Sequence, residues 1–154
     1  MQEVSVIIPN FNGMAYLDGV LAGLECQSVN NFEVILVDNG SSDGSCAFVA
    51  ARYPWVHLIE LPENFGFCKA VNEGIKASRA PYVLLLNNDI EVTENFIEEM
   101  IFAIKRHPKA FSCAARMIQF HDRDKLDDAG NYYCALGWAY ARGKGKDIHT
   151  YEKE

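Results

Sequence analysis

The residues best suited to chemistry follow an apolar run near the middle of the chain. Residues 82–86 are uncharged and rich in leucine and β-forming side chains, and Asn87, Asn88 and Asp89 come directly after them. A run of this kind predicts a strand buried on both faces of a sheet. A carboxylate beside two amides suits a divalent cation and the oxygen-rich ligand that accompanies it. A polar turn before a helix explains the same three residues equally well.

Two other predicted strands, at residues 4–8 and 32–37, also end in polar or aromatic residues. Because parallel strands share their direction, their ends meet at one edge of the sheet, where open α/β sheets bind ligands. The residues expected to gather at this edge are Pro9, Asn10, Phe11, Asn12, Asp38, Asn39, Asn87, Asn88 and Asp89.

This set of side chains suits a nucleotide. Phe11 can stack on a base, Asp38 can accept a hydrogen bond from an imide N–H, and Asn88 can reach ribose hydroxyls. Asp89 would then hold a divalent cation that bridges the phosphates. Asp38 is also a common turn former and Phe11 a common core residue, but the convergence of three strand ends favours a site.

A further loop, at residues 64–67, leads into a predicted helix. Gly66 would let the backbone approach a ligand closely, and the helix N-terminus beyond it favours an anion. Ordinary capping of the helix explains this segment as well.

The elements that must position these residues alternate along the chain. Strands are predicted at 4–8, 32–37, 56–61, 82–86 and 111–117, with Pro9 ending the first, and helices at 15–27, 45–53, 67–78 and 93–107. Alternation of this kind predicts an α/β fold with a mostly parallel sheet flanked by helices and joined by right-handed crossovers. The periodic pattern fills residues 3–120 and decays from His121 into loop and irregular strand.

Composition narrows the class of protein. The chain has 154 residues and a net charge of −7, with no Lys/Arg block before its tail, which argues against nucleic acid as a partner. No apolar stretch approaches the length of a membrane span, and no basic leader opens the chain. The five cysteines are odd in number and scattered, which predicts thiols in a reducing cytoplasm. Dinucleotide-binding, P-loop and serine-hydrolase motifs are all missing.

At these residues the sequence resembles the family-2 glycosyltransferases of the GT-A fold, especially the rhamnosyltransferase-like members. The similarity runs from Val4 to about Gly130. The motifs that carry it are residues 6–12, residues 34–44, residues 64–67 with Ala70 and Asn72, residues 85–89, and more weakly residues 128–130.

The resemblance implies transfer of a sugar from a UDP- or dTDP-linked donor to a saccharide or lipid-linked acceptor, with inversion at the sugar. In such enzymes the first strand end and the Asp38 position hold the base. The D-x-D-like motif reads Asn87-Asn88-Asp89 here, which implies a ribose contact at Asn88 and a Mg²⁺ or Mn²⁺ ion at Asp89. The first acid of that motif is replaced by Asn87.

The resemblance also implies a division of labour along the chain. Residues 3–120 would form the nucleotide-sugar-binding domain, the N-terminal donor-binding portion of the enzyme. Residues 121–154 would begin an acceptor-side segment, with the catalytic base beyond the last residue and little turnover by this chain alone. Such enzymes can work in the cytoplasm, at the inner leaflet of the membrane, without a membrane-spanning segment. Peripheral membrane association is therefore compatible with the resemblance, and so is a homodimer. The alternative is a non-catalytic α/β nucleotide-binding or assembly module with a degenerate site.

Overall fold

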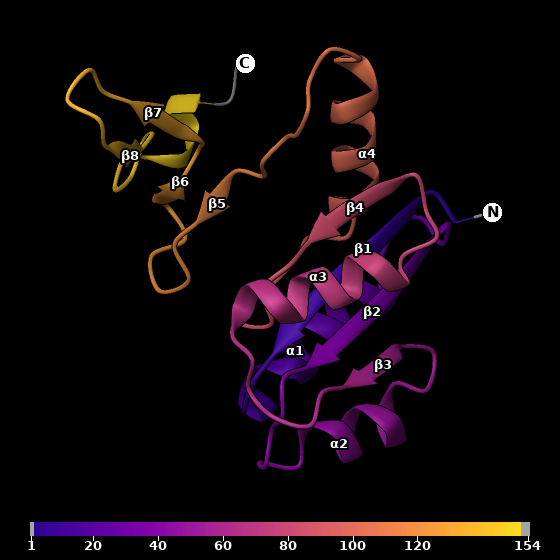
Figure 1. The fold of residues 1–154 in the computed structure, drawn as a ribbon. Helices are drawn as coiled ribbons and strands as arrows, with labels where there is room; N and C mark the ends of the chain where they lie inside the picture. Colours follow the sequence, from indigo (N-terminus) through magenta and orange to yellow (C-terminus); the bar gives the residue numbers. More distant parts are fainter. Residues whose placement is uncertain (1, 152–154) are drawn as a thin grey trace. The chain divides into compact units, whose positions relative to one another are not determined.

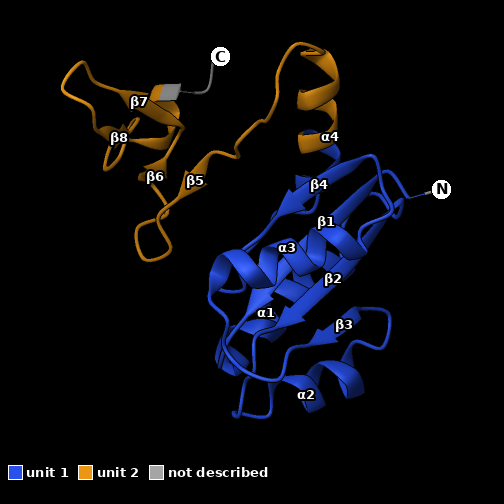
Figure 2. Cartoon of the chain, in the orientation of Figure 1, with its two compact units in different colours: residues 1–99 blue, residues 100–154 orange. Residues whose placement is uncertain are grey.

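The computed structural model describes residues 2–151 and divides into two compact units (Figure 2). Unit 1 comprises residues 1–99 and unit 2 residues 100–154. This division falls earlier than the predicted boundary at residue 120. The assignment of residues 3–120 to donor binding and 121–154 to the acceptor side stays a prediction.

Unit 1 is built on a parallel four-stranded sheet, and it confirms the predicted α/β fold (Figure 1). The strands occur in the order β3-β2-β1-β4, with β1 paired to both β2 and β4. Their bounds are β1 Val4–Asn10, β2 Phe32–Asp38, β3 His57–Glu60 and β4 Tyr82–Leu85. The helices between them are α1 Met14–Glu25, α2 Ser45–Arg52 and α3 Phe67–Ala77.

Helices α1 and α3 lie on opposite faces of this sheet (Figure 1). In α1 the buried side chains recur at helical spacing, as expected of a helix with one apolar face. Helix α3 approaches the sheet most closely at Gly74. A Cβ atom there would lie only 2.4 Å from Cγ2 of Ile7, so no larger residue fits without a shift. Gly74 therefore faces the sheet.

The prediction that Pro9 ends the first strand is wrong, because β1 continues to Asn10. Ile7 accepts a hydrogen bond from Leu86 on the β4 side, and Pro9, two residues later, points to that same side. The pairing of β1 with β4 ends at Ile7. The N–H that proline lacks is therefore not needed by any neighbouring strand.

The prediction that residues 82–86 are buried on both faces is also wrong. Strand β4 lies at the edge of the sheet, and Val83 and Leu85 are 42% and 50% exposed. Leu85 is paired with Ile7, so both side chains belong to the face on which α3 lies. Because α3 packs mainly on β1 and β2, it leaves this part of β4 open.

Helix α4, Phe96–Arg106, spans the division between the units. The rest of unit 2 consists of two antiparallel strand pairs and a 3₁₀ helix. The pairs are β5 Met117–Ile118 with β6 Leu126–Asp128, and β7 Asn131–Tyr133 with β8 Ala139–Ala141; the 3₁₀ helix η1 is Ile148–Tyr151. No helix in the described part of the chain is long and apolar enough to cross a membrane.

The prediction of a strand at residues 111–117 is wrong for all of these residues except the last, Met117, which belongs to β5. Residues 111–116 have no regular structure, and Phe111 is fully exposed. A strand-like composition is realised only when another backbone pairs with it and covers its side chains. Within the described residues, 111–116 has no such partner strand.

Candidate functional site

The strand order of unit 1 reverses beside β1. The chain passes from β1 outward to β2 and β3, and it then returns through α3 to place β4 on the other side of β1. Open α/β sheets bind ligands at such a reversal, outside the carboxyl ends of the strands. Asn10 ends β1 at this point, and Asn88 follows β4.

A chain of side-chain hydrogen bonds links three strand ends at this edge. Nδ2 of Asn10 donates to Oδ1 of Asp38 at 2.8 Å. Nδ2 of Asn88 donates to Oδ1 of Asn10 at 2.7 Å. The structure thus brings Asp38 and Asn88 to Asn10, although they lie 28 and 78 residues away from it along the chain.

Ser41 completes this network, although the sequence analysis did not select it. Its backbone N–H donates to Oδ2 of Asp38 at 2.8 Å. Its Oγ accepts from the backbone N–H of Asn12 at 2.8 Å and from Nδ2 of Asn10 at 3.3 Å. The signal in the sequence is an Asp followed three residues later by a Ser inside a cluster of turn residues.

Asp38 is ionised inside a nearly closed environment, since only 2% of its surface is exposed. Burial by itself would raise its pKa, but hydrogen bonds from Ser41, Asn10 and Cys46 outweigh that effect and lower the pKa below its usual value. Burial and the neighbouring Asp38 carboxylate raise the pKa of Cys46 to about 12, so this thiol stays protonated.

The Asp38 carboxylate is therefore already supplied with donors from the protein. A carboxylate offers about four acceptor positions. Another donor, such as an N–H of a ligand, would have to replace one of those present. The Ser41 hydroxyl is the easiest to replace because its hydrogen can rotate away.

A second network fixes the loop before α3. Nδ2 of Asn39 donates to Oδ1 of Asn64 at 2.8 Å, and Oδ1 of Asn39 accepts from the N–H of Phe65 at 3.0 Å. The Gly66 N–H donates to Oδ1 of Asn64 at 2.8 Å, so it is engaged within the protein. Gly66 itself is exposed, with a φ of 85° that favours glycine.

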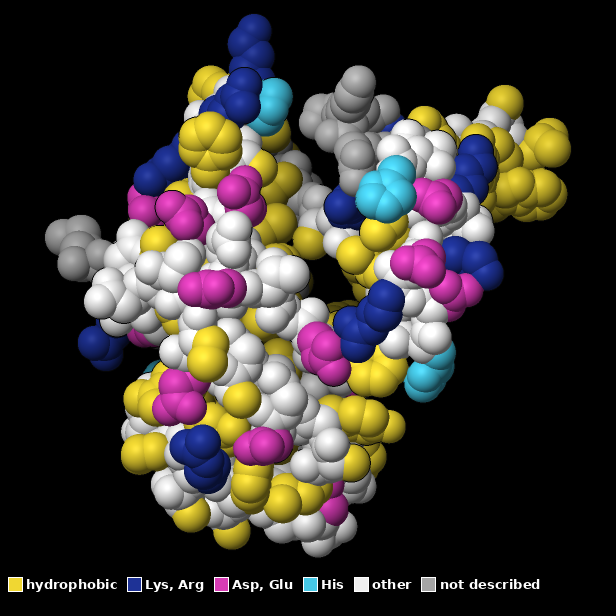
Figure 3. Space-filling model, turned by 180° about the vertical axis from the view of Figure 1, so that it is seen from behind, with side chains coloured by type: hydrophobic (Ala, Val, Ile, Leu, Met, Phe, Trp, Pro, Cys, Tyr) yellow, Lys and Arg dark blue, Asp and Glu magenta, His cyan; other side chains and the backbone are white. Residues whose placement is uncertain are grey.

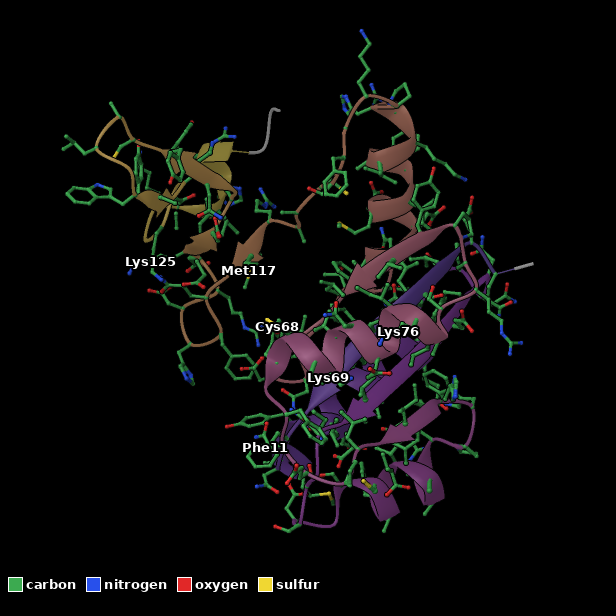
Figure 4. All side chains as sticks on the ribbon, viewed as in Figure 1. Phe11, Cys68, Lys69, Lys76, Met117 and Lys125 are labelled. Carbon is green, nitrogen blue, oxygen red and sulfur yellow. The ribbon has the colours of Figure 1, made fainter. Side chains whose placement is uncertain are left out.

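The other predicted residues of the first strand end surround the network. Phe11 is 48% exposed, so it is not a core residue, which was the alternative considered for it. It lies at the end of unit 1 at which α3 begins, and Cys68 marks the start of that helix (Figure 4). Asn12 has a positive φ of 49°, and its Oδ1 accepts from the N–H of Ser42 at 2.9 Å. Pro9 is partly buried and Asn87 is exposed.

Gly13 is a second residue that the sequence analysis did not select for the site. A Cβ atom at this position would lie 2.1 Å from Nδ2 of Asn88 and 2.3 Å from Oδ1 of Asn10. The bond between Asn10 and Asn88 therefore requires glycine at residue 13, and this requirement is visible only in three dimensions.

Asp43, in the same loop as Ser41, acts as a turn former. Its Oδ2 accepts from the N–H of Met14 at 2.9 Å, and its Oδ1 accepts from the N–H of Ser45 at 3.0 Å. These bonds fasten the first residues of α1 and α2 to one carboxylate. Hydrogen bonds from Ser45 and Met14 lower the pKa of Asp43.

Asp89 lies exposed in the turn after β4. Within residues 2–151, no group of three or more His, Cys, Asp or Glu side chains could hold a metal ion. Mg²⁺ in proteins is often held by one or two carboxylates together with substrate phosphates and water. Asp89 therefore forms no metal site on its own among the described residues, and an ion held there would take its other ligands from a bound diphosphate and water.

Comparison with known proteins places this architecture in a family. The model of the family described as "Glycosyl transferase family 2" matches residues 5–152. Glycosyltransferase GlyG of Streptococcus pneumoniae is 29% identical over 133 residues, which cover 84% of this chain and 39% of that protein.

Solved structures show the same similarity. S. aureus TarS 1-349 in complex with UDP-GlcNAc superposes with a TM-score of 0.64 at 26% identity, over 70% of this chain and 32% of that one. Mannosyltransferase PcManGT from Pyrobaculum calidifontis, in complex with GDP-Man and Mn²⁺, gives a TM-score of 0.55 at 26% identity, over 58% and 28%. The chain thus spans less than half the length of each of these proteins. Since the family model matches almost all of its residues, the chain belongs to glycosyl transferase family 2.

Proposed function

We propose that the protein transfers a sugar from a nucleoside-diphosphate donor to an acceptor hydroxyl, and that this chain mainly carries the donor site. The observation that carries the proposal is the bonded series Asn88–Asn10–Asp38 at the reversal of strand order. Such a series holds polar groups from separate strands in one fixed arrangement, which lowers the cost of ordering them around a ligand.

In this proposal the exposed ring of Phe11 stacks on the base. Asp38 accepts a hydrogen bond from the imide N–H of the base after the Ser41 hydroxyl turns away. Asn88 contacts the ribose with its second Nδ2 hydrogen, the one that it does not donate to Asn10. The remaining residues, Pro9, Asn12, Asn39, Gly66 and Asn87, shape the walls of the site. The nucleotide that we propose is UDP, because the structurally similar protein TarS binds UDP and UDP-GlcNAc. A dTDP-linked donor and rhamnosyl transfer stay predictions.

Asp89 is the proposed ligand of Mg²⁺ or Mn²⁺, supported by the Mn²⁺ in the similar mannosyltransferase. The ion would neutralise charge on the departing diphosphate. Because Asp89 is one carboxylate, the ion and the nucleotide should bind together. Inversion at the sugar, with a saccharide or lipid-linked acceptor, is the proposed outcome of the reaction.

The proposed location is the cytoplasm, which agrees with five cysteines that are all free. A homodimer is also proposed, with the edge of β4, which no strand among the described residues covers, as its candidate surface.

Titration calorimetry with UDP and Mn²⁺ tests the donor site. We expect binding by the chain, a large loss in Asn88→Ala, and no change in Asn30→Ala, where the exposed side chain follows α1 and precedes β2. Equal binding by both variants, or none by the parent chain, would contradict the proposal.

The replacement of the first acid by Asn87 favours a second candidate, a non-catalytic module with a degenerate site. That candidate predicts a melting temperature unchanged by UDP with Mn²⁺. A ligand that binds the native state must instead raise the melting temperature. The same samples therefore separate the two functions.

A further inference from the structure

Unit 1 is acidic, although the proposed donor carries a negatively charged diphosphate. Residues 1–99 contain fourteen Asp and Glu but only four Lys and Arg. Acidic side chains are spread over the face of unit 1 that Figure 3 shows. Asp38, Asp43 and Asp89 lie at the carboxyl edge of the sheet itself, since they end or follow its strands. Because like charges repel, a diphosphate that binds at this edge needs a positive partner there.

Three of the four cationic side chains of unit 1 belong to the opposite edge of the sheet. In a parallel sheet, each connecting helix begins near the carboxyl end of one strand and ends near the amino end of the next. Arg52 and Lys76 lie in the last turns of α2 and α3. Arg79 follows α3, and its backbone N–H donates to Glu33, near the start of β2, at 3.2 Å. Within the described part of unit 1, Lys69 in the first turn of α3 is therefore the one Lys or Arg at the carboxyl edge.

Lys69 lies close to the elements that form the proposed donor site. It follows Gly66, the residue before α3, by three positions. Lys69 lies toward the end of α3 that is on the side of Phe11, and Lys76 lies toward the other end (Figure 4). The Cα–Cβ bond of a helical residue tilts toward the N-terminus of its helix. The flexible side chain of Lys69 can therefore extend toward the carboxyl edge of the sheet.

Glu73 holds Lys69 on the surface of α3, and it also binds a second lysine. Nζ of Lys69 is 2.6 Å from Oε1 of Glu73, and Nζ of Lys76 is 3.0 Å from the same oxygen. The side chains of Lys69 and Lys76 are 49% and 68% exposed, and exposed ion pairs contribute little to stability. When Lys69 turns to another anion, Glu73 keeps Lys76 as its partner. The exchange therefore leaves no carboxylate without a partner.

We propose that Lys69 binds the diphosphate of the nucleotide-sugar donor, by exchanging Glu73 for a phosphate oxygen. This inference rests on the proposed function and adds a residue to the donor site. An ammonium group offers three hydrogen-bond donors, and its charge makes a bond to phosphate stronger than a neutral one. The proposed metal ion relies on a single carboxylate, Asp89. Lys69 supplies positive charge that does not depend on that ion.

Calorimetric titration of the full chain with UDP, in the presence of Mn²⁺, tests the role of Lys69. We expect Lys69→Gln to weaken UDP binding about tenfold or more, because it removes a charge-assisted bond to phosphate. Lys69→Arg keeps the positive charge and should retain most of the binding. Glu73→Gln removes the competing carboxylate, so it should strengthen UDP binding about twofold.

Two controls separate a contact with the diphosphate from general effects. Lys76→Gln removes the same charge from the far end of α3, where the lysine binds the same Glu73 oxygen, and it should bind UDP as the parent chain does. Uridine lacks the diphosphate, so Lys69→Gln and the parent chain should bind it equally. Titration followed by NMR measures this weaker binding, and circular dichroism should show the same fold in all variants.

The outcomes distinguish this inference from the proposed function. Equal UDP binding by Lys69→Gln and the parent chain would overturn the role of Lys69 and leave the donor site intact. An equal loss in Lys76→Gln would overturn it too, because the total charge of the unit would then be the cause. So would a matching loss of uridine binding in Lys69→Gln, which would indicate a structural role. Failure of the parent chain to bind UDP would contradict the donor site itself.

Discussion

The two units differ in how they hold their polar and apolar groups. In unit 1 the buried side chains include most of β1 and β2, and the amides at the strand ends are hydrogen-bonded to one another. In unit 2, Leu126 is the one fully buried hydrophobic residue among those the structure describes, while aromatic side chains of β7 and β8 are exposed. Unit 1 therefore carries a core and a preorganised polar edge, whereas the described part of unit 2 has little core of its own.

This contrast separates two sources of specificity. The polar edge of unit 1 is rigid because Asn10 and Asp38 are almost completely buried and fully bonded. A buried network in which every group is satisfied specifies one arrangement. In the described part of unit 2 only Leu126 is a fully buried hydrophobic residue, so packing specifies its arrangement less strongly. The following changes test the contrast, beginning with the largest expected effect.

The substitution Asn10→Asp should damage unit 1 most. It keeps the shape of the side chain but replaces the donor to Asp38 with a second carboxylate at 2.8 Å. An uncompensated buried charge costs about 3–5 kcal/mol of unfolding free energy. Urea unfolding measures the loss, and it should shrink in acid as one of the two carboxylates takes up a proton. The exposed Asn30→Asp should have almost no effect, and a similar loss there would refute the buried network as the cause.

The substitution Leu126→Ala should unfold unit 2 and leave unit 1 intact. Removing a fully buried leucine costs about 2–5 kcal/mol, and unit 2 has no other fully buried hydrophobic residue in the part described to replace it. Hydrogen exchange followed residue by residue should show loss of protection in 117–148 only. Ile118→Ala, at an exposed position, serves as the control. Loss of protection throughout unit 1 would show that the two units fold as one.

The substitution Gly13→Ala should disrupt the polar edge with a smaller loss of stability, about 1–3 kcal/mol. The added methyl group would overlap Nδ2 of Asn88 and Oδ1 of Asn10, so UDP binding should fall with it. Gly19→Ala in α1 meets no atom within 4 Å and should be neutral or stabilising. Calorimetry and thermal unfolding of the two variants measure the difference, and unchanged UDP binding in Gly13→Ala would contradict the proposed site.

The pH dependence of Asp38→Asn should reveal the ionised state of Asp38. Because folding lowers the pKa of Asp38 below its ordinary value of 3.8, its contribution is fully present above that pH and is lost as the pH falls through the lower folded value. The variant should be about 1–3 kcal/mol less stable near neutral pH, and this difference should narrow in strong acid. A difference that stays constant with pH would show that the charge of Asp38 contributes nothing.

The smallest expected effect is that of Asn87→Asp on metal binding. The substitution adds a second carboxylate two residues before Asp89 in the exposed turn after β4. It should strengthen Mn²⁺ binding in the presence of UDP by about 1–2 kcal/mol. Asn95→Asp, at an exposed position after this turn, is the matched control. Mn²⁺ binding that rises equally in both variants would indicate a general effect of charge.

Much of unit 1 could be predicted from the sequence. The alternation of strands and helices predicted the parallel sheet, because buried strands and one-sided helices leave different periodicities in the chain. The same reasoning failed for residues 111–116 and for the burial of Val83 and Leu85. In both cases the outcome depends on whether another element lies alongside, which local composition does not encode.

For the site, the sequence by itself determined which residue types end each strand, since parallel strands direct their carboxyl ends to one edge. That was enough to select Asn10, Asp38 and Asn88. Only the tertiary structure decided how they are joined, why Ser41 belongs with them and why residue 13 must be glycine. Hydrogen bonds and steric limits act between atoms a few ångströms apart, and those distances are set by the packing of segments far apart in the chain.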